Sequence, residues 1–151
     1  MLLTGPDLMN SLLGVFLRFR KEPVAITVDI NHMFYCFLVR DDHRNYLRFV
    51  WFRHNNIYSD VVEYRMKLHV FGNSPSPAVA TYGLRRTARD GEEELGSDVR
   101  QVIERDFYVD DGLKPLYNDK DSISLIRHTQ QMLAASNLKL HKIASNCPTV
   151  L

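Results

Sequence analysis

Two adjacent carboxylates followed by a glycine are the residues of this chain best suited to chemistry. Asp110 and Asp111 follow the apolar run Phe107–Val109, and Gly112 comes next. This pattern predicts a β-hairpin with Asp111 and Gly112 in its turn. Adjacent carboxylates repel each other unless a cation binds between them, and Mg²⁺ prefers such oxygen ligands. An isolated Asp-Asp-Gly is most often a solvated turn. Other residues of the chain are therefore needed to distinguish a metal site from such a turn.

A third carboxylate ends a different strand. Asp29 lies near the end of the β-branched run Val24–Ile30, which is typical of a buried strand. A charge in that position needs a partner or a metal. If this strand pairs with the hairpin in an antiparallel sheet, Asp29, Asp110 and Asp111 meet at one edge and can hold two Mg²⁺ ions. The alternative for Asp29 alone is a simple turn residue at the end of a strand.

The hydrophobic pattern supplies elements that would position these acids. Apolar spacing predicts three longer helices and one short helix, and β-branched runs predict the strands. The segment 33–39 fits either a short helix or extended chain. This order predicts an α+β fold, an antiparallel sheet with helices packed on one face. The expected helices are 6–19, 76–89, 97–104 and one from Asp119 or Asp121 to 135; the expected strands are 24–30, 47–52, 61–66, the hairpin around 107–113, and 138–143.

Composition restricts the class of protein. The chain has 151 residues, 45% of them hydrophobic, which suits one compact domain. A net charge of +1 is not that of a strongly basic nucleic-acid-binding protein. Cys36 and Cys147 form no evident disulfide framework, so a reduced intracellular setting is expected. No apolar segment is long enough to span a membrane, so no membrane contact is expected.

Five blocks of sequence resemble the polymerase of one family, in the family's order. The chain resembles the reverse transcriptases of BEL/Pao-like LTR retrotransposons over nearly its whole length. The resemblance implies the palm fold of a reverse transcriptase, with residues 1–22 as the end of the fingers region and 23–151 as the palm, and with thumb and RNase H absent. The blocks are Tyr108–Asp111; Gly5–Leu8 with Asn10–Gly14; Asp29-Ile30 with Met33-Phe34; Phe71-Gly72 with Ser76–Ala78; and Ser145-Asn146.

The resemblance also implies catalytic roles. Asp29 and Asp110 match the metal-holding pair of the family, and Asp111 matches the second acid of the hairpin. The cofactor would be two Mg²⁺ ions, with Mn²⁺ as a possible substitute. Lys142 matches a lysine that protonates the leaving pyrophosphate, although a solvated lysine at a strand end explains it nearly as well. Ile143 departs from the family, which usually has Trp there.

Three further residues match positions that contact the nucleotide. Phe34 follows Asp29 by five positions, where the family places a ring under the incoming sugar; the alternative is a core Phe. Phe71 and Gly72 match the family's nucleotide loop, where glycine lets the backbone approach the ligand.

The template is expected to contact the start of the helix after this loop. Ser76, Pro77 and Arg85 match that region, and a helix N-terminus favours phosphate contact. The alternatives are a plain loop-to-helix junction for Ser76 and Pro77, and a solvated helix face for Arg85. Pro75 stands where the family commonly has serine.

The sequence therefore predicts an RNA-directed DNA polymerase domain of a retrotransposon polyprotein. Its partners would be an RNA or DNA template-primer, deoxynucleoside triphosphates, and the missing fingers, thumb and RNase H regions. It would work inside the cell, in a cytoplasmic particle or the nucleus. Two alternatives stay open. One is an inactive or domesticated fragment with weak nucleic-acid or protein binding; the other is a metal-binding regulatory domain, which would explain the acids but not the ordered blocks.

Overall fold

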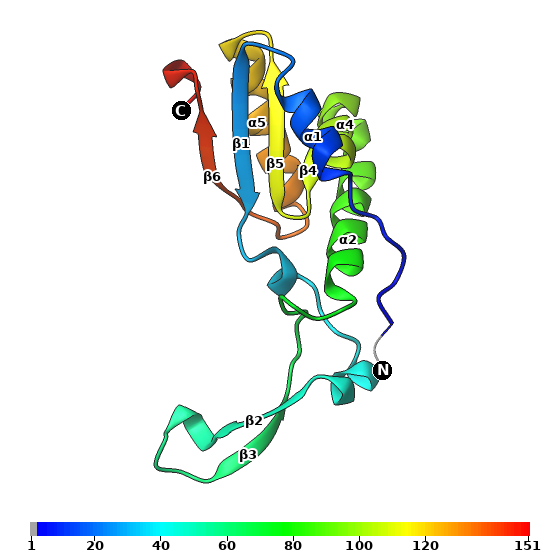
Figure 1. The fold of residues 1–151 in the computed structure, drawn as a ribbon, viewed down its shortest axis with the longest axis vertical. Coiled ribbons are helices and arrows are strands. Elements are labelled where there is room, and N and C mark those ends of the chain that lie inside the picture. Colours follow the sequence, from blue (N-terminus) through cyan, green and yellow to red (C-terminus); the bar gives the residue numbers. More distant parts are fainter. Residues whose placement is uncertain (1–2) are drawn as a thin grey trace.

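A four-stranded antiparallel sheet forms the centre of the protein (Figure 1). The computed structural model describes residues 3–151. The strand order β4-β5-β1-β6 places β1 inside the sheet, paired with β5 on one side and β6 on the other. The strand that carries Asp29 therefore lies directly beside the strand that follows the acidic hairpin. These strands are β1 (Val24–Ile30), β4 (Phe107–Tyr108), β5 (Asp111–Leu116) and β6 (Leu140–Ser145).

Helices cover one face of this sheet. In Figure 1, α5 runs behind β1 and β5, and α2 and α4 lie beside the β4 edge. The helix α1 packs instead against β4 and β5. The α-helices are α1 (Leu12–Phe19), α2 (Ser76–Asp90), α3 (Glu92–Leu95), α4 (Ser97–Arg105) and α5 (Asp119–Ala134); short 3₁₀ helices are η1 (Met33–Cys36), η2 (Asp41–Tyr46), η3 (Arg53–Asn55) and η4 (Pro148–Val150).

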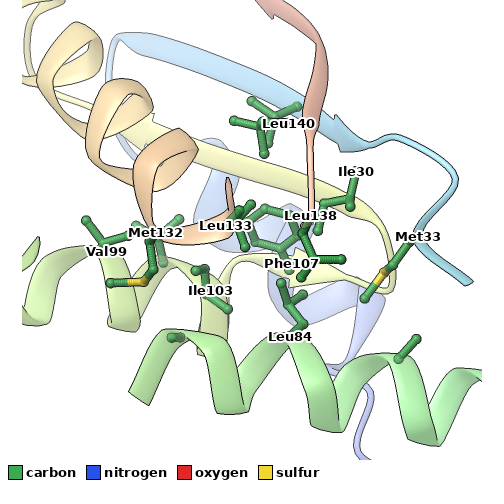
Figure 2. Close-up of a cluster of buried hydrophobic side chains, with 14 of the residues drawn as sticks. Ile30, Met33, Leu84, Val99, Ile103, Phe107, Met132, Leu133, Leu138 and Leu140 are labelled. Carbon is green, nitrogen blue, oxygen red and sulfur yellow. The ribbon is translucent and has the colours of Figure 1, made fainter. Parts of the chain in front are cut away.

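The hydrophobic core lies between the sheet and α2, α4 and α5 (Figure 2). Alternate residues of β1 supply one side of it, because successive side chains of a strand point to opposite faces. Ile26, Val28 and Ile30 are buried, whereas Thr27 and Asp29 are only half-buried. The alternation thus directs Asp29 away from the core. The central residues in Figure 2 are Ile30, Met33, Leu84, Val99, Ile103, Phe107, Met132, Leu133, Leu138 and Leu140.

A second, two-stranded sheet projects from this body (Figure 1). It consists of β2 (Arg48–Phe52) and β3 (Val61–Arg65), paired antiparallel. Apart from the half-buried Phe52 and Val62, its strand residues are exposed. We call β2, β3 and the turn between them the ribbon.

The observed architecture confirms the predicted α+β fold with its antiparallel sheet and helices on one face. The expected start of the first helix at Pro6 is wrong. The helix begins at Leu12, because the Ser11 side chain caps it by accepting a hydrogen bond from the Gly14 N–H. At α5, Asn118 is the cap, in place of the expected Asp119 or Asp121.

No helix within residues 3–151 is both long enough and apolar enough to cross a membrane.

Candidate functional site

The sheet brings the three predicted acids to one place. Asp29 on β1 lies directly opposite Asp111 on β5 in the antiparallel register. Asp110 belongs to the turn that joins β4 and β5. Its carbonyl accepts a 2.9 Å hydrogen bond from the Ile30 N–H, which ties the turn to the end of β1. The predicted meeting of strand and hairpin is therefore observed.

The hairpin turn lies two residues earlier than the sequence predicted. Tyr108 pairs with Asp111, so the turn residues are Val109 and Asp110. Val109 has a φ of 57°, in the left-handed region that β-branched residues rarely adopt. Such backbone strain persists only where the surrounding structure imposes it, and it is frequent at functional sites. Here the tight turn places Asp110 and Asp111 at the end of the hairpin.

Gly112 is needed for packing and not for the turn. It lies in β5 opposite Val28. A Cβ atom at this position would lie 2.6 Å from Cγ2 of Val28 and 2.7 Å from Cζ of Phe107. Real Cβ atoms do not approach so closely, because protein cores are densely packed. The glycine lets β5 lie close under Phe107 and so fixes Asp111 beside it.

The three acids influence one another electrostatically. The carboxyl of Asp111 loses part of its water, and this raises its pKa above the ordinary value. The negative charges of Asp110 and Asp29 raise this pKa further, and the positive charge of Lys142 lowers it. The His141 ring also lies near, with Nδ1 3.8 Å from Oδ1 of Asp29. The site thus concentrates negative charge that a cation would relieve.

An irregularity in β6 places Lys142 beside these acids. The pairing of β1 with β6 shifts register between Thr27 and Asp29. Lys142 lies at this point with a φ of 47°. A bulge of this kind redirects a side chain, and bulges are common next to active sites. The sequence pointed to Lys142 by resemblance, but nothing in it indicated the bulge.

The chemistry of the donor set suits Mg²⁺. Three carboxylates offer the hard oxygen ligands that this ion prefers. As placed, however, no group of three or more His, Cys, Asp or Glu side chains within residues 3–151 is arranged to hold a metal ion. The carboxylates would have to turn toward each other around a bound ion. The residue types therefore fit the cofactor, while the arrangement is not a preformed metal cage.

Two of the predicted nucleotide residues lie together. The rings of Phe34 and Phe71 meet edge to face, with centroids 5.9 Å apart. Phe34 is buried in the core, as its alternative interpretation proposed, whereas Phe71 is 84% exposed. Gly72 has a φ of 82°, a conformation that favours glycine, and within residues 3–151 no atom beyond its two chain neighbours lies within 4 Å of its would-be Cβ. The loop therefore has an open surface beside the Phe71 ring.

The predicted template residues differ in their exposure. Ser76 is 1% exposed, and its hydroxyl lies 3.3 Å from Nδ1 of the buried His69. Its side chain therefore faces inward and offers nothing to a template. Pro77 is half-buried in the first turn of α2. Arg85 is also half-buried, with Nη2 3.4 Å from Oδ1 of Asn10, so it is not a fully solvated side chain.

Sequence reasoning missed a network that anchors the hairpin. Asp106 comes directly before β4 and is buried. It pairs with Nε of Arg18 at 3.2 Å and with Nζ of Lys114 at 2.9 Å. The Asn10 amide donates hydrogen bonds to the backbone oxygens of Glu104 and Phe107. These long-range contacts fix α1 and β5 against the base of the hairpin. No local sequence pattern predicts them.

Comparisons with known proteins extend this description. No protein-family model and no curated protein matches the chain. Among solved structures, it is similar to a foamy viral protease-reverse transcriptase solved in complex with an RNA/DNA hybrid, with a TM-score of 0.67 and 14% sequence identity. The match covers 90% of this chain and 16% of the viral chain. The protein thus has an α+β fold similar to part of that viral protein, and it spans about a sixth of the viral chain's length.

Proposed function

We propose that this chain is the palm region of an RNA-directed DNA polymerase from a BEL/Pao-like LTR retrotransposon. The observation that carries the proposal is the register of β1 and β5, which sets Asp29 opposite Asp111 and next to the turn with Asp110. Residues 1–22 would lead in from the fingers region, and 23–151 would form the palm. The similar fold of a viral reverse transcriptase that holds an RNA/DNA hybrid supports a nucleic-acid partner.

In this proposal the residues of the chain have distinct tasks. Asp29, Asp110 and Asp111 would hold Mg²⁺. When bound, the metal would lower the pKa of the primer 3′-hydroxyl and neutralise charge on the triphosphate. Lys142, exposed and beside the acids, would give a proton to the leaving pyrophosphate.

The loop would then position the nucleotide. The exposed Phe71 ring and the open backbone at Gly72 would contact the deoxynucleoside triphosphate. Phe34 would support the Phe71 ring from the core and limit the space beside the sugar. Pro77 and Arg85 would lie toward the template. Positioning supplies most of the catalysis in phosphoryl transfer, so these contacts would matter as much as the acids.

A second candidate function is an inactive or domesticated fragment that keeps this fold. One observation favours it. The acids are not gathered as a metal cage within the described residues. On this alternative, the fold would bind nucleic acid or protein weakly without catalysis. Lys and Arg residues of a fingers region encoded upstream in the same reading frame would argue for the polymerase.

Primer extension on an RNA template with deoxynucleotides and Mg²⁺ tests the proposal. We expect extension by the chain, and none by Asp110→Asn, because one metal ligand is lost. Asp98→Asn, which changes an exposed acid on α4, is the matched control and should extend like the original. Extension that persists in Asp110→Asn would contradict the assigned role of the acid.

A binding measurement separates the two candidate functions. Thermal unfolding with and without Mg²⁺ reports metal binding, because a ligand that binds the folded state raises Tm. A Tm increase that Asp110→Asn abolishes, without any extension, would favour the fragment. If Mg²⁺ leaves Tm unchanged and the chain extends no primer, the proposed metal role of the three acids in this chain is wrong.

A further inference from the structure

The sequence block Asn10–Gly14 is distant along the chain from the acidic hairpin, yet its first residue is bonded to the base of that hairpin. The Asn10 side-chain amide donates hydrogen bonds to the backbone oxygens of Glu104, at 3.1 Å, and Phe107, at 2.7 Å. The oxygen of the same amide accepts a hydrogen bond from Nη2 of Arg85 at 3.4 Å. These three contacts fix the orientation of the amide, because the reverse orientation would set its oxygen against two carbonyl oxygens.

Arg18 lies in the last turn of α1, which packs against β4 and β5 (Figure 1). Its Nη2 donates to the backbone oxygen of Arg105, and its Nε donates to Oδ1 of the buried Asp106 at 3.2 Å. The last backbone oxygens of a helix such as α4 have no partner inside that helix, and a cation at this end is favoured by the helix dipole. We call residues 104–107, which Asn10 and Arg18 bind together, the corner.

The corner leads directly into the strained turn of the hairpin. β4 consists of only two residues, and Val109 in the turn has a φ of 57°. Backbone strain of this kind persists only where neighbouring contacts impose it. On one side of the turn, the Asp110 carbonyl accepts a 2.9 Å hydrogen bond from the Ile30 N–H. On the other side, Asn10 gives the Phe107 oxygen of this edge strand a partner outside the sheet.

We propose that Asn10 and Arg18 are positioning residues, which hold the corner and thereby keep Asp110 and Asp111 in the place where a metal ion would be bound. The inference rests on the proposed metal role of the acids, although the positioning itself requires no metal. The alternative is a contribution to overall stability alone, since contacts between distant segments stabilise any fold. Loss of a contact would then affect the whole protein equally, and not the hairpin in particular.

Hydrogen exchange followed by NMR, without Mg²⁺, separates these two cases. The Ile30 amide is bonded to the Asp110 carbonyl and reports the turn. The Asn146 amide is bonded to the Ala25 carbonyl at 3.3 Å, near the opposite end of β1, and reports the rest of the sheet. Asn10→Asp replaces the donor nitrogen with an oxygen and so removes both hydrogen bonds to the corner. We expect exchange to become about tenfold faster at Ile30 and to stay unchanged at Asn146, because only local opening becomes easier.

Two further variants complete the experiment. Arg18→Lys keeps a cation beside Asp106 but loses the second bond of the guanidinium, so it should accelerate exchange at Ile30 by less than Asn10→Asp does. Asn56→Asp is the matched control. It makes the same chemical change on the exposed ribbon, where the Asn56 side chain accepts a backbone hydrogen bond as aspartate also can, and it should leave both amides unchanged. Circular dichroism verifies that each variant is folded.

Equal acceleration at Ile30 and Asn146 in Asn10→Asp would overturn the proposal, because the contacts would then stabilise the protein as a whole. Unchanged exchange at both amides would overturn it as well.

Primer extension adds a second measurement. If the original chain extends a primer, Asn10→Asp should raise the Mg²⁺ concentration for half-maximal extension by about tenfold, since residues that support metal ligands commonly contribute that much. An unchanged Mg²⁺ requirement would contradict the positioning role. If the original chain extends no primer, the proposed polymerase activity of this chain fails, and hydrogen exchange alone decides whether Asn10 positions the hairpin. The two failures are therefore distinguishable.

Discussion

The strands of the four-stranded sheet are packed under helices, whereas the strands of the ribbon are exposed. In the body, the apolar residues of β1 alternate with polar ones and pack under helices, so half of the strand is buried. In the ribbon, both faces carry apolar side chains, and no helix in the part of the chain that the structure describes covers either one. The stability of the fold therefore resides in the body, whereas the apolar and aromatic surface of the ribbon stays largely exposed.

The same contrast applies to charged groups. The body holds a buried carboxylate, Asp106, with Arg18 and Lys114, and it holds three acids close together at the end of its strands. In the ribbon, Arg48 and Glu63 pair in contact with water. Charges in the body can be expected to affect stability and pH response, whereas the exposed pair in the ribbon should contribute only about 0–1 kcal/mol.

Removing core volume tests this contrast most strongly. Leu133 is fully buried between α5 and the sheet, so Leu133→Ala should lower the free energy of unfolding by about 2–5 kcal/mol. Val50 of the ribbon is 66% exposed, and Val50→Ala should change the free energy of unfolding by no more than about 0.5 kcal/mol. Urea denaturation of both variants measures the difference. Similar losses in the two would show that the ribbon is part of the cooperative core.

Adding one methyl group tests the close contact of β5 with the core. Gly112→Ala would place a Cβ against Val28 and Phe107, so it should destabilise the protein by about 1–3 kcal/mol. Gly14→Ala in α1 is the matched control. Its Cβ meets no atom closer than 3.4 Å, and alanine in a helix is more stable than glycine by up to about 1 kcal/mol.

The two glycine variants are compared by thermal unfolding. We expect Tm to fall for Gly112→Ala and to stay constant or rise for Gly14→Ala. Equal Tm values would mean that β5 can move away from Phe107 at little cost, and the fixed position of Asp111 would then need another explanation.

Much of the fold was predictable because its signals are local. The β-branched run Val24–Ile30 predicted β1 with the observed bounds, and the apolar runs around 47–52 and 61–66 predicted the pair that forms the ribbon. The convergence of Asp29 with Asp110 and Asp111 also followed, because strand ends in an antiparallel sheet are constrained to meet. Local pattern and simple topology were sufficient for these features.

Other features depend on contacts between distant residues. The turn falls on Val109 and Asp110 because Gly112 is required inside β5, where Phe107 packs over it. The bulge at Lys142 arises from the pairing of β6 with β1, and the inward position of Ser76 from its contact with His69. The network around Asp106 joins residues almost 90 positions apart. Propensity within a short window carries no information about such partners.

The smallest expected effect concerns the acids themselves. Partial desolvation, Asp110 and Asp29 raise the pKa of Asp111 above the ordinary value of an unfolded chain, about 3.9. Between these two pKa values the folded protein binds more protons than the unfolded one. The free energy of unfolding therefore falls as pH rises through this window and stays lowered above it. Asp111→Asn removes the charge, so its Tm should exceed that of the original at pH 7, and the difference should shrink below pH about 3.9.

A ribbon variant shows whether this pH response belongs to the acidic site. Glu63→Gln removes one carboxylate of an exposed ion pair, and such pairs contribute only about 0–1 kcal/mol. Its Tm at pH 7 should match the original or lie slightly below it, the opposite sign to Asp111→Asn. If Asp111→Asn instead lowers Tm at pH 7, the Asp111 carboxylate stabilises the hairpin, and the three acids do not repel one another in the folded state. A repulsion relieved by Asp111→Asn would mean that the fold holds these carboxylates together at a cost, as a cation site requires.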